Sequence, residues 1–268
     1  MRRTFRALIL SSLFLITIAS PQASFADMLD RIQQRGQLIL VTSGNMPMMS
    51  QLEDSGQLSG LDIDIAKFIA QAMKVELVPM VMPFNELLPA LESGKVDIVI
   101  SNMTITPMRN LRVAFVGPYF TSGKCFITKD EALAQPEPAV NLNTAEIRLA
   151  ALNGSTSQEV IEQLYPAATL ITFERYADAI DQIKKNEIKG MLVDYPVCVA
   201  TLEAHPNAGF SSLLTMITYE PIGIALPAND AHFINWIENF LHRLEGTGTL
   251  KSLSETWFGP IMVTPLGQ

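Results

Sequence analysis

Apolar and polar positions follow two periods along this chain, and together they predict strands that alternate with helices. Short apolar runs between turn residues are typical of buried strands, whereas apolar positions three and four residues apart are typical of helices. Their alternation indicates an α/β fold with mostly parallel sheets. In the first part of the chain we expect strands at 37–42, 75–81 and 96–101 and helices at 62–73 and 85–92. Asn85 should cap the second helix, and Gly94 should close it.

A second set of elements repeats this order. The stretches 88–100 and 181–193 both run from helix through turn to strand, which indicates a weak internal duplication of a βαβαβ unit. The stretches 119–128 and 221–226 are extended and could be two strands that cross between the units, and 135–138 should be a surface loop. The other elements are expected as strands at 147–152, 169–173 and 189–193 and as helices at 157–164, 175–185, 230–245 and 248–257.

Polar side chains gather where strands of both units end. The segment from Ser101 to Arg109 offers amides, hydroxyls and an Arg that could hold a carboxylate with two N–H groups. Two α/β lobes joined by two strands form a hinged clamp, whose cleft lies at the carboxyl ends of both sheets. From the second lobe, residues 154–156 would line the cleft at a helix start and Asp194 would face them. Judged locally, an ordinary turn with a surface Arg explains Arg109 equally well.

The first 26 residues read as a signal peptide. Arg2, Arg3 and Arg6 make a basic start, the apolar run 7–19 has the length of a signal core, and Ala26 ends a cleavage site of small residues. That run is too short for a comfortable membrane span, and no other apolar stretch reaches spanning length. We therefore expect cleavage after Ala26 and export to the periplasm, with no cysteine near the junction to carry a lipid.

Charge and cysteine content narrow the function further. The chain has 19 basic and 27 acidic residues, and loss of the leader would remove three of the arginines. Such acidity argues against nucleic acid and anionic membrane surfaces as partners. Cys125 and Cys198 are either two separate buried thiols or a disulfide, which is favoured if Cys125 lies on a strand beside the one that ends at Asp194. They form no zinc or redox motif.

Four segments resemble the periplasmic amino-acid-binding proteins of ABC importers, solute-binding protein family 3. They are Gly-Leu-Asp-Ile-Asp-Ile-Ala-Lys at 60–67, residues 88–105 with Arg109, Val-Gly-Pro-Tyr-Phe at 116–120 and Trp-Phe-Gly at 257–259. No single motif is specific, but together and in this order they are. The resemblance implies a type II periplasmic-binding-protein clamp with a signal peptide at 1–26, a first lobe from 27–120 and 222–268, and a second lobe from 121–221.

The resemblance also assigns the residues that hold an amino-acid head group. Arg109 would take the α-carboxylate with help from Thr156, and Asp194 would take the α-ammonium with an oxygen of Thr104 and groups at Ser101 and Asn102. Asp194 could equally be the N-cap of the helix that begins at Pro196, or combine both roles. The expected ligand-binding residues are Ser43, Met46, Phe84, Ser101, Asn102, Thr104, Arg109, Ser155, Thr156 and Asp194.

One departure from the family pattern bears on the ligand side chain. Members that bind basic or amide side chains usually have an Asp after the first strand, then an aromatic residue and Pro-Phe. Here Ser43 replaces the acid, Met46 the aromatic residue and Met49 the Phe, while Phe84 keeps its aromatic ring. A basic ligand side chain would lose its counter-charge, and methionines would form an adaptable apolar wall. We therefore expect a neutral side chain, unless these methionines only pack the lobe and the ligand is polar.

Three other functions compete with amino-acid capture. Cyclohexadienyl (arogenate) dehydratases share the fold, but they use a general-acid Glu shortly after the Asp194 position, where this chain has Tyr-Pro-Val-Cys at 195–198. A second alternative takes Met46, Met48 and Met49 as a soft-metal site. A third is the ligand-loaded partner of a membrane receptor. We expect a non-enzymatic monomer without cofactor, whose partner is an inner-membrane ABC permease. Asp62 and Asp64 should be helix caps, and Trp257 should pack the last helix.

Overall fold

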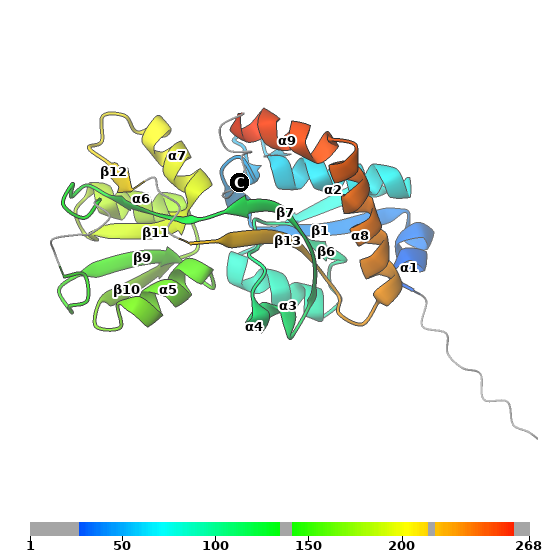
Figure 1. Ribbon diagram of the computed structural model, residues 1–268, viewed down its shortest axis with the longest axis horizontal. Coiled ribbons are helices and arrows are strands. Elements are labelled where there is room, and N and C mark those ends of the chain that lie inside the picture. The colour runs from blue at the N-terminus through cyan, green and yellow to red at the C-terminus, as the bar shows by residue number, and fades with distance from the viewer. Residues whose placement is uncertain (1–26, 135–140, 214–217, 260–268) are drawn as a thin grey trace, which may run out of the picture.

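The computed structural model describes residues 27–134, 141–213 and 218–259. The expected signal peptide and the expected loop at 135–138 lie outside the described residues. Two α/β lobes lie side by side along the long axis of the molecule, and two strands cross between them (Figure 1). Each lobe is built on a five-stranded sheet. The alternation of strands and helices predicted from the sequence is confirmed.

The first lobe contains a sheet whose strands come from both ends of the chain. Its strands are β1 (Gln37–Thr42), β5 (Glu76–Val81), β6 (Ile98–Val99), β7 (Ala114–Ser122) and β13 (Glu220–Leu226). Their order is β5-β1-β6-β13-β7, with the first three parallel and β13 antiparallel to both of its neighbours. The main helices of this lobe are α1 (Met28–Arg35), α2 (Leu61–Met73), α3 (Leu87–Glu92), α8 (Ala231–Gly246) and α9 (Thr249–Phe258).

The second lobe repeats the arrangement. Its strands are β8 (Lys124–Thr128), β9 (Arg148–Leu152), β10 (Thr169–Phe173), β11 (Gly190–Asp194) and β12 (Ser211–Leu213), and its helices are α5 (Thr156–Leu164), α6 (Tyr176–Lys184) and α7 (Tyr195–Ala204). The order is β10-β9-β11-β8-β12, and again three parallel strands continue into two antiparallel ones. In both parallel triplets the strand that comes first in the chain lies in the middle, which agrees with the predicted duplication.

Two details near the cleft differ from the sequence prediction. A 3₁₀ turn, η1 (Phe84–Glu86), precedes α3, so Asn85 lies inside the turn and the prediction that it caps the helix is wrong. Pro83, whose ring fixes φ, stands at the start of this turn instead. Gly94 does follow the helix, with φ of +72°, a conformation that Gly adopts without steric cost. A small sheet of β2 (Asn45–Met46), β3 (Ser50–Leu52) and β4 (Leu58–Ser59) was not predicted.

Two crossing strands join the lobes, and a disulfide lies within the second lobe. β7 and β13 pair with each other along the passage between the lobes (Figure 1). β8 continues from β7 and pairs with β11, so that Cys125 lies opposite Val193. Cys125 forms a disulfide with Cys198, which lies in the first turns of α7. The bridged alternative for the two cysteines is therefore the one that holds.

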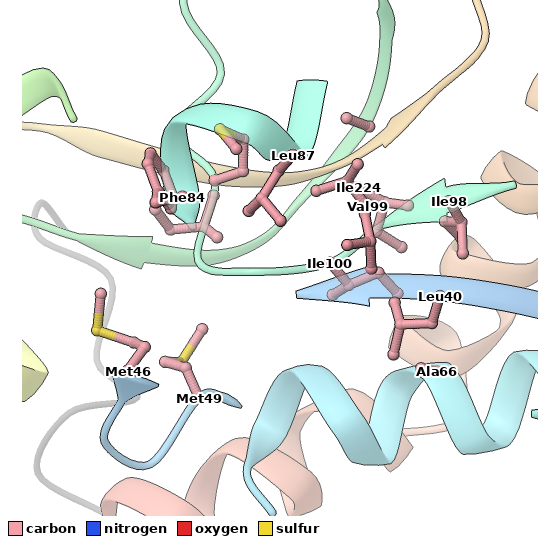
Figure 2. Packing of buried hydrophobic residues seen from close by; sticks show 14 of the residues in the cluster. Leu40, Met46, Met49, Ala66, Phe84, Leu87, Ile98, Val99, Ile100 and Ile224 are labelled. Carbon is pink, nitrogen blue, oxygen red and sulfur yellow. The ribbon is translucent and has the colours of Figure 1, made fainter. Parts of the chain in front are cut away.

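The last described helix, α9, packs as expected. Phe258 stacks on Phe120 with ring centroids 4.7 Å apart, and Trp257 is half-buried against the main cluster of apolar side chains while its Nε1 donates to Asp64 Oδ2 at 3.0 Å. Figure 2 shows the middle of that cluster, where Leu40 of β1, Ala66 of α2 and side chains of β6 meet. Within the described residues, no helix is long and apolar enough to cross a membrane.

Candidate functional site

A cleft lies between the two lobes. Its volume is about 700 Å³, and mostly apolar side chains from both lobes line it. From the second lobe it reaches Tyr176, at the start of α6, and Val197 in α7. Ser43 lines it from the first lobe, at the position where the sequence predicts the pocket for the ligand side chain. The lining residues are Ser43, Gly44, Asn45, Pro47, Gln51, Leu52, Val81, Met82, Pro83, Glu174, Arg175, Tyr176, Ala177, Ile180, Val197, Ala200, Thr201, Ala204 and His205.

Arg109 is a buried cation at the junction of the lobes. It lies on the short helix α4 (Pro107–Asn110), whose N-cap hydroxyl, from Thr106, accepts from the Arg109 backbone N–H. The guanidinium donates to the carbonyl of Thr104 at 2.9 Å and, in the second lobe, to that of Gly154 at 3.0 Å; neither Arg109 nor Gly154 lines the cleft. It also lies over the ring of Phe84, 5.6 Å from the centroid. These contacts exclude the ordinary surface Arg.

Within the described residues, the positive charge of Arg109 is not neutralised by an ion pair. Burial lowers its pKa, while the charges of Glu159, Asp194 and Glu220 oppose this effect. Among the described residues, no carboxylate forms an ion pair with it. A buried guanidinium bonded only to neutral carbonyls is electrostatically costly, so the site favours an anion at this position.

Asp194 is held by two side chains and does not cap its helix. It stands at the N-cap position of α7 but makes no capping hydrogen bond. Its Oδ1 accepts from Lys124 Nζ at 2.5 Å, and its Oδ2 accepts from Asn102 Nδ2 at 3.0 Å. The first bond lies within the second lobe, and the second crosses from the first lobe. The Oδ1 of Asn102 is buried and has no hydrogen-bond partner among the described residues.

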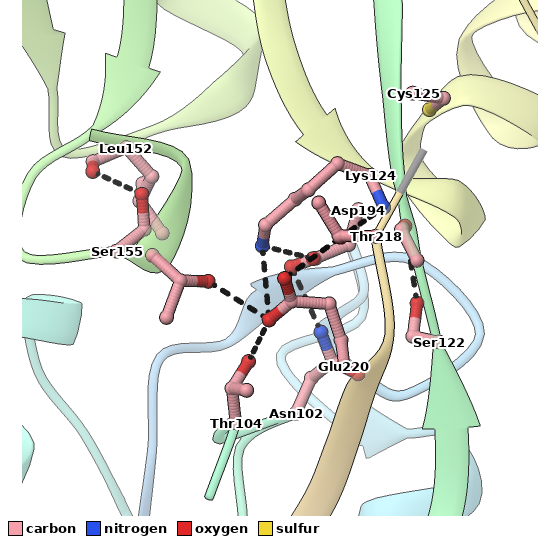
Figure 3. A network of polar contacts seen from close by, with 12 residues as sticks. Asn102, Thr104, Ser122, Lys124, Cys125, Leu152, Ser155, Asp194, Thr218 and Glu220 are labelled. Carbon is pink, nitrogen blue, oxygen red and sulfur yellow. Dashed lines mark hydrogen bonds and ion pairs between the residues drawn. The ribbon is translucent and has the colours of Figure 1, made fainter. Parts of the chain in front are cut away.

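Glu220 gathers three hydroxyls around one carboxylate (Figure 3). Its Oε2 accepts from Thr104 Oγ1 at 2.8 Å and from Thr156 Oγ1 at 3.1 Å. Its Oε1 accepts from Thr218 Oγ1 at 2.8 Å. Lys124 Nζ lies 3.7 Å from Oε2, so one buried ammonium serves two buried carboxylates. Thr104 and Thr156, both expected to hold a ligand, thus meet at a carboxylate of the chain itself.

Lys124 and Glu220 are the residues that the sequence analysis missed. A signal was present, because Lys124 lies within the stretch 119–128 and Glu220 directly precedes the stretch 221–226, both expected to be extended. Lys, in particular, is almost never fully buried unless it is paired, and Lys124 is only 1 % exposed. An ionised side chain in such a position indicates a buried partner, although its identity depends on the tertiary fold.

Three serines were expected to bind the ligand, and two of them, Ser101 and Ser155, bond the backbone through their hydroxyls. Ser101 Oγ accepts from the N–H of Ser43 at 2.9 Å and donates to Ser43 Oγ at 3.2 Å. Ser155 is the N-cap of α5: its hydroxyl accepts from Gln158 N–H and donates to the carbonyl of Leu152. These contacts fix the ends of β1, β6 and β9, the strand ends that face the cleft.

Asp62 bonds the backbone of Asn102, and it is not the helix cap that the sequence predicted. Gly60 occupies the N-cap position of α2, and Asp62 is fully buried. Its carboxylate accepts from the backbone N–H of Asn102 at 2.8 Å and from the hydroxyl of Tyr119 at 2.6 Å. Burial raises the pKa of Asp62 to about 6, although both hydrogen bonds lower it. Asn102 needs such support because its φ is +46°, in the left-handed region.

The methionines lie mainly in the core. Met49 is fully buried and Met46 nearly so, and both belong to the main apolar cluster (Figure 2). Neither lines the cleft, whereas their neighbour Pro47 does. Packing accounts for both side chains. In the part of the chain that the structure describes, no group of three or more His, Cys, Asp or Glu residues could hold a metal ion.

The chain is similar to known amino-acid-binding proteins in sequence and in structure. ABC transporter arginine-binding protein 1 of Escherichia coli (strain K12) is 27 % identical over 219 residues, which cover 81 % of this chain and 88 % of that protein. L-cystine-binding protein TcyJ of the same strain is 24 % identical and covers 88 % of each chain. A crystal structure of the ancestral amino acid-binding protein AncCDT-1, a precursor of cyclohexadienyl dehydratase, matches with a TM-score of 0.78 at 32 % identity, over 87 % of this chain and all of that one.

The likeness extends over the whole of both lobes. The structural neighbours are type II periplasmic-binding-protein clamps, and the match with this chain covers nearly their full length. The predicted fold class is therefore confirmed. The family model for bacterial extracellular solute-binding proteins, family 3, matches residues 38–260. The chain belongs to this family of solute-binding proteins.

Proposed function

We propose that the protein captures a small α-amino acid between its lobes and presents it to an inner-membrane ABC permease. The observation that carries this proposal is the buried guanidinium of Arg109, which reaches both lobes and has no carboxylate partner among the described residues. A ligand carboxylate would supply the missing charge and accept two N–H groups in a planar fork. Thr156, at the first turn of α5, would assist as a hydroxyl donor.

The site also carries a negative charge that would pair with the ammonium of the ligand. Asp194 and Glu220 carry two negative charges, and Lys124 balances only one of them. The remaining negative charge is linked to Arg109 through Thr104, whose carbonyl accepts from Arg109 and whose hydroxyl donates to Glu220. The site therefore offers one unbalanced positive and one unbalanced negative charge close together, which suits a zwitterion.

The proposed side chain of the ligand is neutral. The part of the cleft beside Ser43 is lined by apolar groups such as Leu52, Val81 and Val197. Glu174 is the one carboxylate among the lining residues, and it is exposed at the cleft rim, where its Oε1 accepts from Asn153. A basic side chain would find no buried counter-charge there. Relatives named for arginine and cystine show that the family accepts different side chains, so this preference must come from the chain's own cleft.

We propose capture without chemistry, in the periplasm after removal of a signal peptide near Ala26. Family membership supports an extracellular or periplasmic location. The hinge would lie at the lobe boundaries near 120–121 and 221–222, where the two strands cross. The first turn of α7 has no carboxyl group at residues 195–198, so it supplies no general acid for a dehydratase. A membrane receptor could read the same closed form, and a transport assay with the permease separates the two roles.

A binding screen tests the proposal directly. All common amino acids, with arogenate, prephenate and Cu(I) added, would be scored by thermal shift and then by calorimetry, because a bound ligand raises the melting temperature by mass action. We expect a neutral amino acid to bind, and neither arogenate nor prephenate to be turned over. Strong binding of Lys, Arg or His instead would contradict the proposed side-chain preference.

The Arg109→Met variant tests the carboxylate assignment. It should lose about 2–5 kcal/mol of binding free energy, since a buried carboxylate would lose its partner. Arg112→Met, three residues away and in an exposed ion pair with Glu92, is the matched control and should bind as the wild type does. Equal affinity of Arg109→Met and wild type would overturn the proposed clamp.

A further inference from the structure

The groups expected to hold a ligand head group are already bonded to charges of the chain. Asp194, the proposed ammonium partner, holds Lys124 Nζ at 2.5 Å. Thr104 and Thr156 both donate their hydroxyls to Glu220 Oε2. An ammonium and a carboxylate of the protein therefore engage Asp194, Thr104 and Thr156, residues proposed to hold the charged groups of an amino acid (Figure 3).

Lys124 cannot leave this place when the lobes move. It lies opposite Asp194 in the antiparallel pairing of β8 with β11, so the sheet of the second lobe sets their separation. The next residue, Cys125, is tied to α7 by the disulfide. The side chain of Lys124 is only 1 % exposed. Whatever happens at the hinge, Lys124 remains within reach of Asp194.

Glu220, by contrast, bonds to both lobes at once. It begins β13, one of the two crossing strands. Thr104 belongs to the first lobe, where it forms a β-bridge with Ile222, and Thr156 begins α5 of the second lobe. One carboxylate oxygen thus ties the lobes together through two hydroxyls. A ligand carboxylate bound to Arg109 and Thr156 would compete with it, because two carboxylates repel each other over one set of donors.

We propose that Lys124 is a fixed counter-ion that exchanges carboxylate partners when an amino acid binds. When Glu220 holds the two threonines, Lys124 neutralises Asp194. When the ligand carboxylate takes the hydroxyl of Thr156, Glu220 turns to Lys124, which lies 3.7 Å away without ligand, and Asp194 becomes free for the ligand ammonium. In the ligand-bound state the ligand carboxylate would pair with Arg109, Lys124 with Glu220 and the ligand ammonium with Asp194, so the two charges that are unbalanced without ligand become paired. The inference rests on the proposed function for the identity of the head group, and it assigns Lys124 and Glu220 as positioning residues.

This exchange predicts an unusual pattern of affinities. In Glu220→Gln, Lys124 would neutralise Asp194 permanently, so the ligand ammonium would lose its counter-charge and the affinity should fall at least about tenfold. In the double variant Lys124→Met with Glu220→Gln, Asp194 regains its free charge, and the affinity should return to the wild-type value or exceed it. If each substitution merely damaged the site, the double variant would bind more weakly than Glu220→Gln.

Calorimetry with the amino acid found by the screen measures this cycle, and circular dichroism checks that each variant is folded. Recovery in the double variant supports the exchange, and an additive loss overturns it. The control is the double variant Arg112→Met with Glu92→Gln, which removes an exposed ion pair of the first lobe and should leave the affinity unchanged.

A second measurement needs no ligand and so separates this inference from the proposed function. Wild type and Glu220→Ala would be freed of bound small molecules by unfolding and refolding, and their radii of gyration compared by small-angle X-ray scattering. Because Glu220 ties the lobes, Glu220→Ala should be more expanded, whereas Glu203→Ala, an exposed residue of α7, should match the wild type. Equal radii for Glu220→Ala and wild type would overturn the inference, whether or not any amino acid binds.

Discussion

At the residue scale, the buried carboxyl group of Asp62 makes the stability of the fold depend on pH. Full burial opposes ionisation and raises its pKa from 3.8 to about 6. The folded state therefore binds a proton more readily than the unfolded state does. This contribution to stability is complete below about pH 4 and is lost as the pH rises through about 6.

The variant Asp62→Asn tests this reasoning. Its uncharged amide can still accept from the Asn102 N–H, so the fold of the site should persist without the titrating group. Between pH 4 and 7 the wild type should lose on the order of 2–3 kcal/mol of unfolding free energy relative to this variant, from a shift of about two pKa units. Urea unfolding across this range measures the difference, and a constant difference would show that Asp62 does not titrate there.

Tyr119→Phe gives a second check on the same group. The hydroxyl of Tyr119 donates to Asp62 and lowers its pKa, so its removal should raise that pKa further. The pH range over which stability falls should then move to higher values.

Some residues of the site could be placed from the sequence alone, and others could not. Arg109, Thr156 and Asp194 could be placed at one cleft because each follows a strand or begins a helix at the same edge of its sheet. Lys124 and Glu220 could not, because they are 96 positions apart and their pairing depends on how two crossing strands meet. For the same reason Asp62 was interpreted as a cap, since its partners Asn102 and Tyr119 are distant in sequence.

At the element scale, the regular strands and helices could be predicted because their apolar periods are long enough to be distinct. β1 and β10 were predicted to the residue. β6 is shorter than expected; directly before it, the carboxylate of Asp97 accepts from the N–H of Ile39 and pairs with Arg35. The strands β2, β3 and β4 have two or three residues each, which is too few for any alternation to appear.

The disulfide is the element-scale feature with the sharpest test. It joins β8 to α7 across a separation of 73 residues, beside the pair Lys124 and Asp194. Replacing both cysteines by Ser should cost about 2–5 kcal/mol of stability, as for other native disulfides of exported domains. Thermal unfolding with and without a reductant measures this, and the reductant should have no effect on the double variant. Equal melting temperatures for reduced and oxidised wild type would contradict the expectation.

At the scale of the whole molecule, the proposed closure would depend on a close approach between the lobes at Gly154. A Cβ at Gly154 of the second lobe would lie 2.9 Å from the Cβ of Asn85 in the first lobe. Gly154 also has φ of +75°, so Ala there is strained as well, by about 1–2 kcal/mol. The strain acts in the open and the closed forms alike, but the clash with Asn85 acts only when the lobes meet.

Gly154→Ala should therefore weaken ligand binding by about tenfold or more, because it disfavours the closed form that binds. The double variant with Asn85→Gly removes the atom in the way and should recover much of the affinity, while it keeps the backbone strain. Calorimetry on the three variants measures this. Failure of the double variant to recover would place the defect in the loop of Gly154 and not in closure.

The path of the chain through the two sheets has a consequence for the order in which the lobes can be completed. β13 lies between β6 and β7, so the sheet of the first lobe lacks an inner strand until residue 226 has been made. All five strands of the second sheet lie between residues 124 and 213. During synthesis from the N-terminus, the second lobe is therefore the first whose sheet can close. The lobe that begins the chain must wait for the segment that begins with Glu220, the same segment that later ties the two lobes together.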